Sequence, residues 1–73
     1  PENAYIQDSW GWHLFVRGRV KEAVVELEKA AALKADEPTI LEHLADAYLK
    51  LNLREKARKR YHQAVELAQD RAE

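Results

Sequence analysis

Three histidines, His13, His43 and His62, are the side chains of this 73-residue chain best suited to bind a metal or to transfer a proton. A helical zinc site places two histidines four residues apart, often within HExxH, and no pair of these three has that spacing. The chain has no cysteine, which removes thiolate ligands and disulfides as well. The sequence therefore predicts no metal site, and it predicts that the three histidines lie on the surface.

The single serine, Ser9, is the candidate nucleophile, and Asp8 is the carboxylate beside it. Adjacent residues on a helix point in different directions, so these two side chains do not form a catalytic pair. We expect them to support the first turns of a helix instead. Gly11 and Gly18 stand seven residues apart with helical sequence between them, which is not a phosphate-binding loop. The sequence predicts neither an enzyme nor a cofactor site.

The formal charges nearly cancel, with 12 basic and 13 acidic residues and a net charge of −1. This balance argues against a dedicated nucleic-acid-binding protein. No apolar run approaches the ~20 residues that cross a bilayer, so we expect no membrane insertion. One basic run lacks the interleaved aromatic residues that stack on bases, and we expect it to form a solvated helix face. It consists of Arg54, Lys56, Arg58, Lys59 and Arg60.

Four helices account for a composition rich in Ala, Leu, Glu, Lys and Arg, with only two glycines and two prolines. Apolar residues that recur every three or four positions predict helices at 4–17, 20–34, 38–51 and 53–69. Asn3 and Asp36 are the expected N-caps, and Pro38 fits a first helical turn. Gly18 and Asn52 tolerate the left-handed conformation that ends a helix. Connections of two or three residues make consecutive helices antiparallel neighbours.

The chain also repeats itself with a period of 34 residues. A shift by 34 places Gly18 on Asn52, so the two expected helix ends coincide. The shift keeps the size class of the other compared residues: Trp10 on Leu44, Gly11 on Ala45, Leu14 on Tyr48, Ala23 on Ala57, Leu27 on Tyr61, Ala30 on Ala64 and Leu33 on Leu67. Small residues let two helix backbones approach, and the larger ones fill the space beside them. Two copies of one helical hairpin follow.

A helical hairpin with this period resembles the tetratricopeptide repeat, whose pattern is W-x2-L-G-x2-Y, then A-x3-F, then P. The matching slots hold Trp10, Gly11, Leu14, Ala23, Leu27 and Ala30 in the first copy, and Leu44, Ala45, Tyr48, Ala57, Tyr61 and Ala64 in the second. The departures are Gln7 and Leu41 at the W slot, and Ala35 and Gln69 at the P slot. The resemblance implies an all-α fold, a right-handed α–α superhelix or solenoid of two helix–turn–helix hairpins and four helices.

The resemblance also implies a single domain, 1–73, with repeat one at 4–37 and repeat two at 38–71. The segments D-S-x-G-W and P-x-I-L-x-H-L-x-D-A are similar to bacterial tetratricopeptide proteins, which often carry several repeats and are often linked to the cell envelope. The chain begins with Pro1 and has no methionine, so we expect a fragment of such a protein. Its location stays open between the cytoplasm and the bacterial envelope.

In proteins that this chain resembles, the first helix of each hairpin lines a concave groove that holds an extended peptide or a partner's helix. The matching residues are Tyr5, Asp8, Trp12, Phe15 and Val16 in the first copy, and Thr39, Glu42, Asp46, Leu49 and Lys50 in the second. Trp10 and Trp12 lie about 200° apart on a helix, which assigns Trp10 to the core slot and Trp12 to the groove. The excess of acidic residues in this set favours a protein or peptide ligand with apolar and basic residues.

Two functions remain open at this point. Exposed aromatic residues favour a protein–protein interaction module that binds a peptide or partner segment in the groove and has no catalytic activity. The alternative is a structural, self-associating repeat segment, a homo-oligomer or part of a longer array, because two repeats fall below the usual three. In that case Trp12 packs against a neighbouring repeat or a second copy. Such an assembly would also cover apolar groups among Leu51, Leu53, Tyr61 and Val65.

Overall fold

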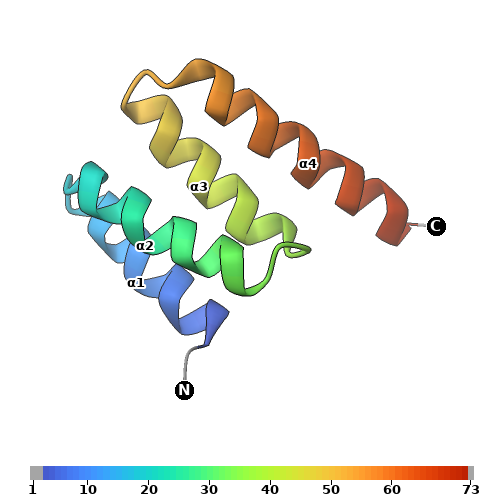
Figure 1. The fold of residues 1–73 in the computed structure, drawn as a ribbon, viewed down its shortest axis with the longest axis horizontal. Helices are drawn as coiled ribbons and strands as arrows, with labels where there is room; N and C mark the ends of the chain where they lie inside the picture. Colours follow the sequence, from blue (N-terminus) through green and yellow to red (C-terminus); the bar gives the residue numbers. More distant parts are fainter. Residues whose placement is uncertain (1–2, 73) are drawn as a thin grey trace.

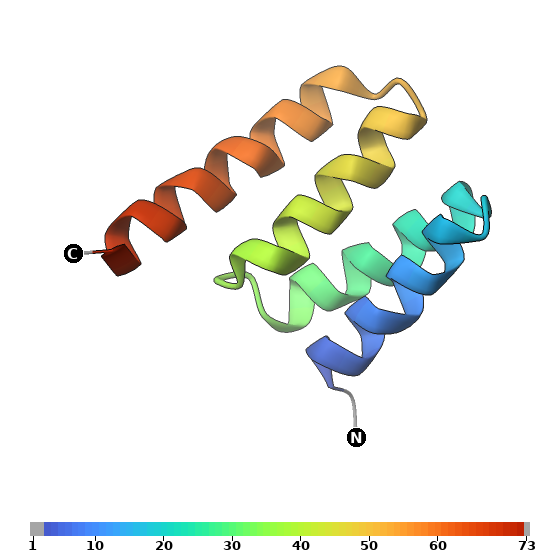
Figure 2. The ribbon, with the colours of Figure 1, turned by 180° about the vertical axis from the view of Figure 1, so that it is seen from behind.

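The computed structural model describes residues 3–72, which form four α-helices and no strand. The helices are α1 (Ala4–Val16), α2 (Val20–Leu33), α3 (Pro38–Lys50) and α4 (Arg54–Ala72). Each helix packs against the next, and α1 also contacts α3. Figures 1 and 2 show the α1–α2 hairpin lying beside the α3–α4 hairpin. The predicted all-α fold of two helix–turn–helix hairpins is confirmed.

The start of α1 follows the sequence prediction. The Asn3 Oδ1 accepts hydrogen bonds from the backbone N–H groups of Tyr5 at 2.9 Å and Ile6 at 3.2 Å. These bonds satisfy two of the four N–H groups that the first turn of a helix leaves without a backbone partner. Asn3 is therefore the N-cap of α1.

The start of α3 corrects the prediction that Asp36 is its N-cap. Pro38 lies in the first turn, as predicted, but Glu37 holds the N-cap position and its side chain makes no capping bond. The Asp36 carboxylate instead accepts a hydrogen bond from the Lys34 ammonium at 3.2 Å. The opposite charge two residues away attracts this carboxylate away from the helix N-terminus.

The two hairpin turns have the same construction. Gly18 has a φ of +85° and Asn52 a φ of +63°, the left-handed conformation predicted for both. The N–H groups of Gly18 and Arg19 donate to the carbonyl oxygens three and five residues earlier, each at 2.9 Å. Asn52 and Leu53 make the same two bonds at the same lengths. This is the Schellman motif at the end of a helix, and it recurs after 34 residues.

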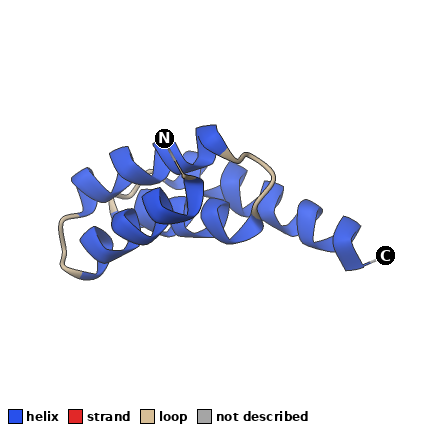
Figure 3. Ribbon diagram, turned by 90° about the horizontal axis from the view of Figure 1, so that it is seen from below, coloured by secondary structure: helices blue, strands red, loops and turns tan. Residues whose placement is uncertain are grey.

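The last helix is longer than its sequence pattern predicted, and it runs to Ala72 rather than to 69. Figure 3 shows its C-terminal turns projecting beyond the other helices. Most of the basic run near its start is exposed, as predicted, whereas Arg60 is half-buried. The Lys56 ammonium lies 5.6 Å from the ring centre of Tyr48, a cation–π contact between α4 and α3.

Small residues, five large aliphatic side chains and the ring of Tyr48 form the core. Leu27, Ile40, Leu41 and Leu44 are the largest side chains that are fully buried. At Gly11 an added Cβ would lie 2.7 Å from the Leu27 Cγ, so only glycine permits this approach of α1 and α2 without a shift. The buried alanines are Ala4, Ala23, Ala30, Ala31, Ala45, Ala47, Ala57 and Ala64. The close-packing role predicted for the small residues thus fits the structure.

Trp10 does not occupy a core slot, and that prediction is wrong. Its side chain is 51% exposed and stacks on His13, with 5.4 Å between the ring centres. The equivalent residue of the second hairpin, Leu44, is 0% exposed. The difference arises because α2 packs against α3, whereas no helix within residues 3–72 covers the equivalent side of α1. Repeat register alone therefore does not determine burial.

Candidate functional site

The ten residues predicted for the groove lie on α1 and α3, and together they define what we call the α1–α3 face. Its exposed members are Tyr5, Val16, Thr39, Glu42, Leu49 and Lys50. Trp12, Phe15 and Asp46 are half-buried, and Asp8 is buried. The two helices contact each other, so the face is continuous across the two hairpins.

Three aromatic rings stack across this face. The ring centres of Trp12 and Phe15 are 4.7 Å apart, with 14° between the ring planes. Trp12 also stacks on His43 of α3, with 4.2 Å between the ring centres and 21° between the ring planes. Such stacking contributes beyond the area it buries. Trp12 is therefore the middle ring of a three-ring stack that joins α1 to α3.

His43 belongs to this site, and the prediction that it is a surface histidine is wrong. Its Nδ1 lies 2.9 Å from the Oδ1 of Asp8, a carboxylate that is itself buried. Asp8 is thus paired with α3 rather than supporting the first turn of its own helix. A buried carboxylate requires such a partner. The repeat register aligns His43 with Ser9, so no motif in the sequence indicated this contact.

Asp46 on α3 is held by a residue of α4. The Tyr61 hydroxyl donates a hydrogen bond to Asp46 Oδ1. Burial and this bond to a carboxylate raise the pKa of Tyr61 from 10.0 to about 12. The hydroxyl donor is uncharged, so this bond is not an ion pair, and the acidic residue Glu42 lies exposed nearby on α3. The side of α3 that belongs to this face therefore carries acidic residues at the middle of the helix.

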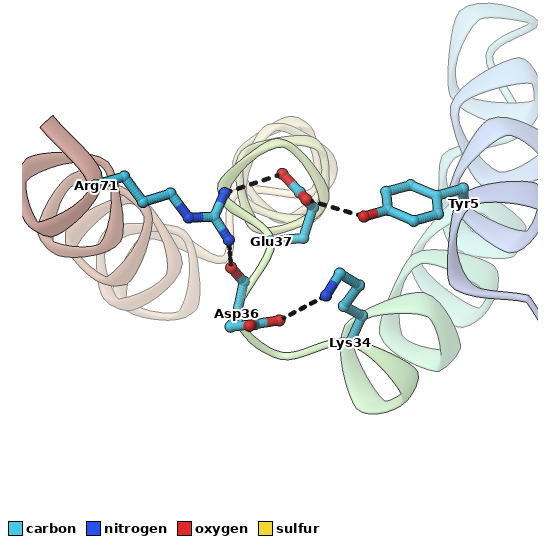
Figure 4. A network of polar contacts seen from close by, with 5 residues as sticks. All are labelled: Tyr5, Lys34, Asp36, Glu37 and Arg71. Carbon is cyan, nitrogen blue, oxygen red and sulfur yellow. Dashed lines mark hydrogen bonds and ion pairs between the residues drawn. The ribbon is translucent and has the colours of Figure 1, made fainter.

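A polar network lies at the end of this face where α1 and α3 begin (Figure 4). The Tyr5 hydroxyl donates to the Glu37 carboxylate at 3.2 Å, and the Arg71 guanidinium lies 3.7 Å from the same carboxylate. Arg71 also donates to the backbone carbonyl of Asp36. The network therefore connects the start of α1, the turn between the hairpins and the end of α4.

The neighbouring pair in Figure 4, Lys34 and Asp36, is exposed to solvent. Their mutual hydrogen bond and charge attraction raise the pKa of Lys34 and lower the pKa of Asp36. Solvent screens such a pair, so it orders the turn more than it stabilises the fold.

No cluster of three or more His, Cys, Asp or Glu side chains within residues 3–72 is arranged to hold a metal ion. None of the helices in this part of the chain combines the length and the apolar character required to span a bilayer.

The family model described as Tetratricopeptide repeat matches residues 14–73, more than half of the chain. The chain belongs to the tetratricopeptide-repeat family. No curated protein and no solved structure matches it in the corresponding comparisons. Membership makes the chain a protein-interaction repeat module, and such repeats are generally not catalytic.

The tetratricopeptide-repeat match starts at Leu14, within α1, and continues through the last helix. It includes the whole second hairpin and the α2 helix of the first. The α1–α3 face is therefore built from the first helix of each tetratricopeptide hairpin.

Proposed function

We propose that the tetratricopeptide chain binds a peptide segment or a partner's helix along the α1–α3 face and performs no catalysis there. The observation that carries the proposal is the Phe15–Trp12–His43 stack, a rigid aromatic surface that crosses from one hairpin to the other. Rigid aromatic side chains are favoured anchors of protein interfaces because they bury large area at small entropic cost.

Apolar side chains extend the surface on both sides of the stack. Tyr5 is exposed near the start of α1, and Val16 and Leu49 are exposed near the ends of α1 and α3. An apolar ligand side chain placed against Trp12 would therefore have further apolar contacts along the face. Scattered single apolar residues need no such explanation, but a row along one face is a candidate interface.

The charges of the face favour a cationic ligand. Glu42 is exposed, and the partner of Asp46 is the uncharged hydroxyl of Tyr61 rather than a cation. Lys50 is the one basic residue among the ten of the face. We therefore propose a ligand that combines apolar residues with a Lys or Arg, whose positive charge is complementary to the middle of α3.

The two tryptophans provide a matched experiment. Peptides are selected from a displayed random-peptide library on the wild-type chain, and their Kd values are then measured for Trp12→Ala and Trp10→Ala. We expect selected peptides to be enriched in aromatic or aliphatic residues next to Lys or Arg. Trp12→Ala should raise the Kd by at least tenfold, a loss of about 1.4 kcal/mol or more, whereas Trp10→Ala should leave it unchanged.

The selected peptide also tests the charge argument, through Glu42→Gln. This change removes the exposed carboxylate without changing its shape, and we expect weaker binding whose difference from wild type disappears at high salt. Equal affinity of the wild type and Trp12→Ala, with circular dichroism showing both folded, would contradict the proposal. Equal losses for Trp10→Ala and Trp12→Ala would contradict it as well.

A further inference from the structure

The outward side of α1 exposes an apolar surface that the second hairpin buries. Ile6 is 71% exposed and lies beside Trp10 on this side, and His13 is exposed next to Trp10. The residues at the same register in the second hairpin are Ile40, Leu44 and Ala47, and all three are 0% exposed. Position 6 even holds the same residue type as position 40. We call Ile6, Trp10 and His13 the α1 end face.

A complementary surface lies at the opposite end of the molecule. Glu42 of α3 and four residues of α4 line a hollow of about 110 Å³ with a mostly apolar wall. The α4 residues are Tyr61, Ala64, Val65 and Ala68. Val65 is 54% exposed, whereas Ala31, its equivalent in the first hairpin, is 7% exposed. We call this set the α4 end hollow.

By repeat register, the two surfaces correspond to the two sides of the interface between the hairpins. A shift of the α4 end hollow by 34 residues gives the set Asp8, Leu27, Ala30, Ala31 and Lys34. In the first hairpin this set lies where α3 packs against α2 and α1, and where His43 contacts Asp8. The hollow is therefore the counterpart of the site that receives α3, and α1 is the counterpart of α3.

We infer that the α4 end hollow of one copy binds the α1 end face of a second copy, head to tail. The new interface continues the α2–α3 interface at the same register, with Ile6 and Trp10 in the places of Ile40 and Leu44. The contact joins two different surfaces, so each added copy leaves one of each surface free and the assembly is open-ended. The α4 end hollow shares only Glu42 with the α1–α3 face, and this inference does not rest on peptide binding there.

One pair of charges limits the strength of this contact. In the existing interface between the hairpins, Leu51 after α3 and Val20 at the start of α2 line the same hollow. The residues at the same register in the new interface are Arg17 from the second copy and Arg54 from the first. Their like charges repel each other, so we expect the association to be weak. We expect it to become stronger as the salt concentration rises, because salt screens the repulsion.

Two single substitutions remove one surface each, and their mixture gives the decisive experiment. Ile6→Glu places a charge in the α1 end face, and Val65→Glu places one in the α4 end hollow. Both residues are more than half exposed, so the fold should tolerate both changes. Val25→Glu is the matched control, because Val25 is exposed in the first hairpin and the equivalent residue of the second hairpin, Lys59, is exposed as well.

Sedimentation equilibrium measures the assembly over a concentration series, with circular dichroism to verify folding. We expect the wild type and Val25→Glu to form a concentration-dependent series of dimers and larger species. Ile6→Glu and Val65→Glu should each raise the Kd at least tenfold. Their equimolar mixture should form dimers and nothing larger, because it contains one intact surface pair per two chains.

Three results would overturn the inference. The first is a wild type that stays monomeric up to millimolar concentration, which leaves the two surfaces to other partners. The second is a closed dimer that never grows with concentration, which indicates a two-fold contact. The third is a mixture of the two variants that dimerises no better than either alone.

A variant that is expected to associate more tightly than the wild type tests the proposed register of the interface independently. Arg17→Leu restores the residue type that the second hairpin has at this position, Leu51, and removes the repulsion from Arg54. We expect this variant to associate at least several-fold more tightly than the wild type at low salt, with the difference reduced at high salt. A variant that associates as weakly as the wild type at every salt concentration would show that the register is wrong.

Discussion

The outward sides of α1 and α3 carry residues at the same repeat register and have opposite environments. Trp10 on α1 is half exposed, and Leu44 on α3 is fully buried. The helices themselves are equally long, and both end in the same Schellman turn. The local sequence thus determines the helix and its turn, whereas burial depends on whether another helix lies alongside. In a repeat protein, one slot contributes to the core or to the surface according to its neighbour.

The inward sides of the two hairpins differ in chemistry. The first hairpin has Leu14 and Leu27 where the second has Tyr48 and Tyr61. Both tyrosines of the second hairpin donate their hydroxyls to carboxylates, Tyr48 to Glu28 at 2.6 Å and Tyr61 to Asp46. At these two positions the second hairpin therefore makes hydroxyl–carboxylate bonds where the first has aliphatic side chains, and the Tyr48 bond joins α3 to Glu28 of α2.

The largest expected effect is the difference in stability between alanine variants of the two equivalent outward residues, Leu44 and Trp10. Leu44→Ala should lower the free energy of unfolding by about 2–5 kcal/mol, because it leaves a cavity in a fully buried site. Trp10→Ala should change it by less than about 0.5 kcal/mol in the monomer, because the indole is half exposed. Urea unfolding followed by circular dichroism measures both. Similar losses in the two variants would contradict the comparison.

The close-packed slots of the two hairpins give the next effect. Gly11→Ala should cost about 1–3 kcal/mol through overpacking, because its Cβ would meet Leu27 at 2.7 Å. The reverse change in the second hairpin, Ala45→Gly, should cost only about 1 kcal/mol, which is the difference in helix propensity between alanine and glycine. Thermal unfolding of both variants tests this difference. A Gly11→Ala variant more stable than the wild type would show that Leu27 moves aside without strain.

The smallest effect concerns the tyrosines and appears with pH. Burial and the Glu28 carboxylate raise the pKa of Tyr48 from 10.0 to about 12. The folded state then holds the phenol proton more tightly than the unfolded state does. The resulting stabilisation is complete below pH 10, and it is lost as pH rises from there to about 12.

The variant that tests this pH dependence is Tyr48→Phe. Loss of its hydroxyl bond should lower the free energy of unfolding by about 0.5–1.5 kcal/mol at neutral pH. Its stability should then fall less steeply above pH 10 than that of the wild type. Tyr5→Phe is the control, because that ring is half exposed and its bond to Glu37 lies at the surface. Parallel pH profiles for the wild type and Tyr48→Phe would contradict the assigned role of the hydroxyl.

The features that the sequence predicted correctly are those that depend on nearby residues. Asn3 caps α1, and the left-handed residues Gly18 and Asn52 end α1 and α3, because capping and turn chemistry act over a few positions. The predicted close approach at Gly11 also agrees with the structure, since the repeat pattern itself specifies a small residue there.

The features that escaped prediction depend on residues far apart in the sequence. The Asp8–His43 pair joins residues 35 positions apart, and neither residue matches a repeat slot. The repeat slot of Trp10 usually holds a buried residue and so predicts a core position, yet burial there requires a further helix. The prediction of Asp36 as a cap failed because the competing attraction of Lys34 is not part of a capping pattern. The ligand of the α1–α3 face stays a prediction.

The Glu37 carboxylate has a mechanical consequence. It receives Tyr5 from the first hairpin and Arg71 from the end of the second, and it lies at the turn that joins them. A rotation that separates the two hairpins at this turn stretches these contacts. They are exposed and partly ionic, so dissolved salt loosens them far more than it loosens the aliphatic core. The bending stiffness between the hairpins therefore has a component that falls as ionic strength rises.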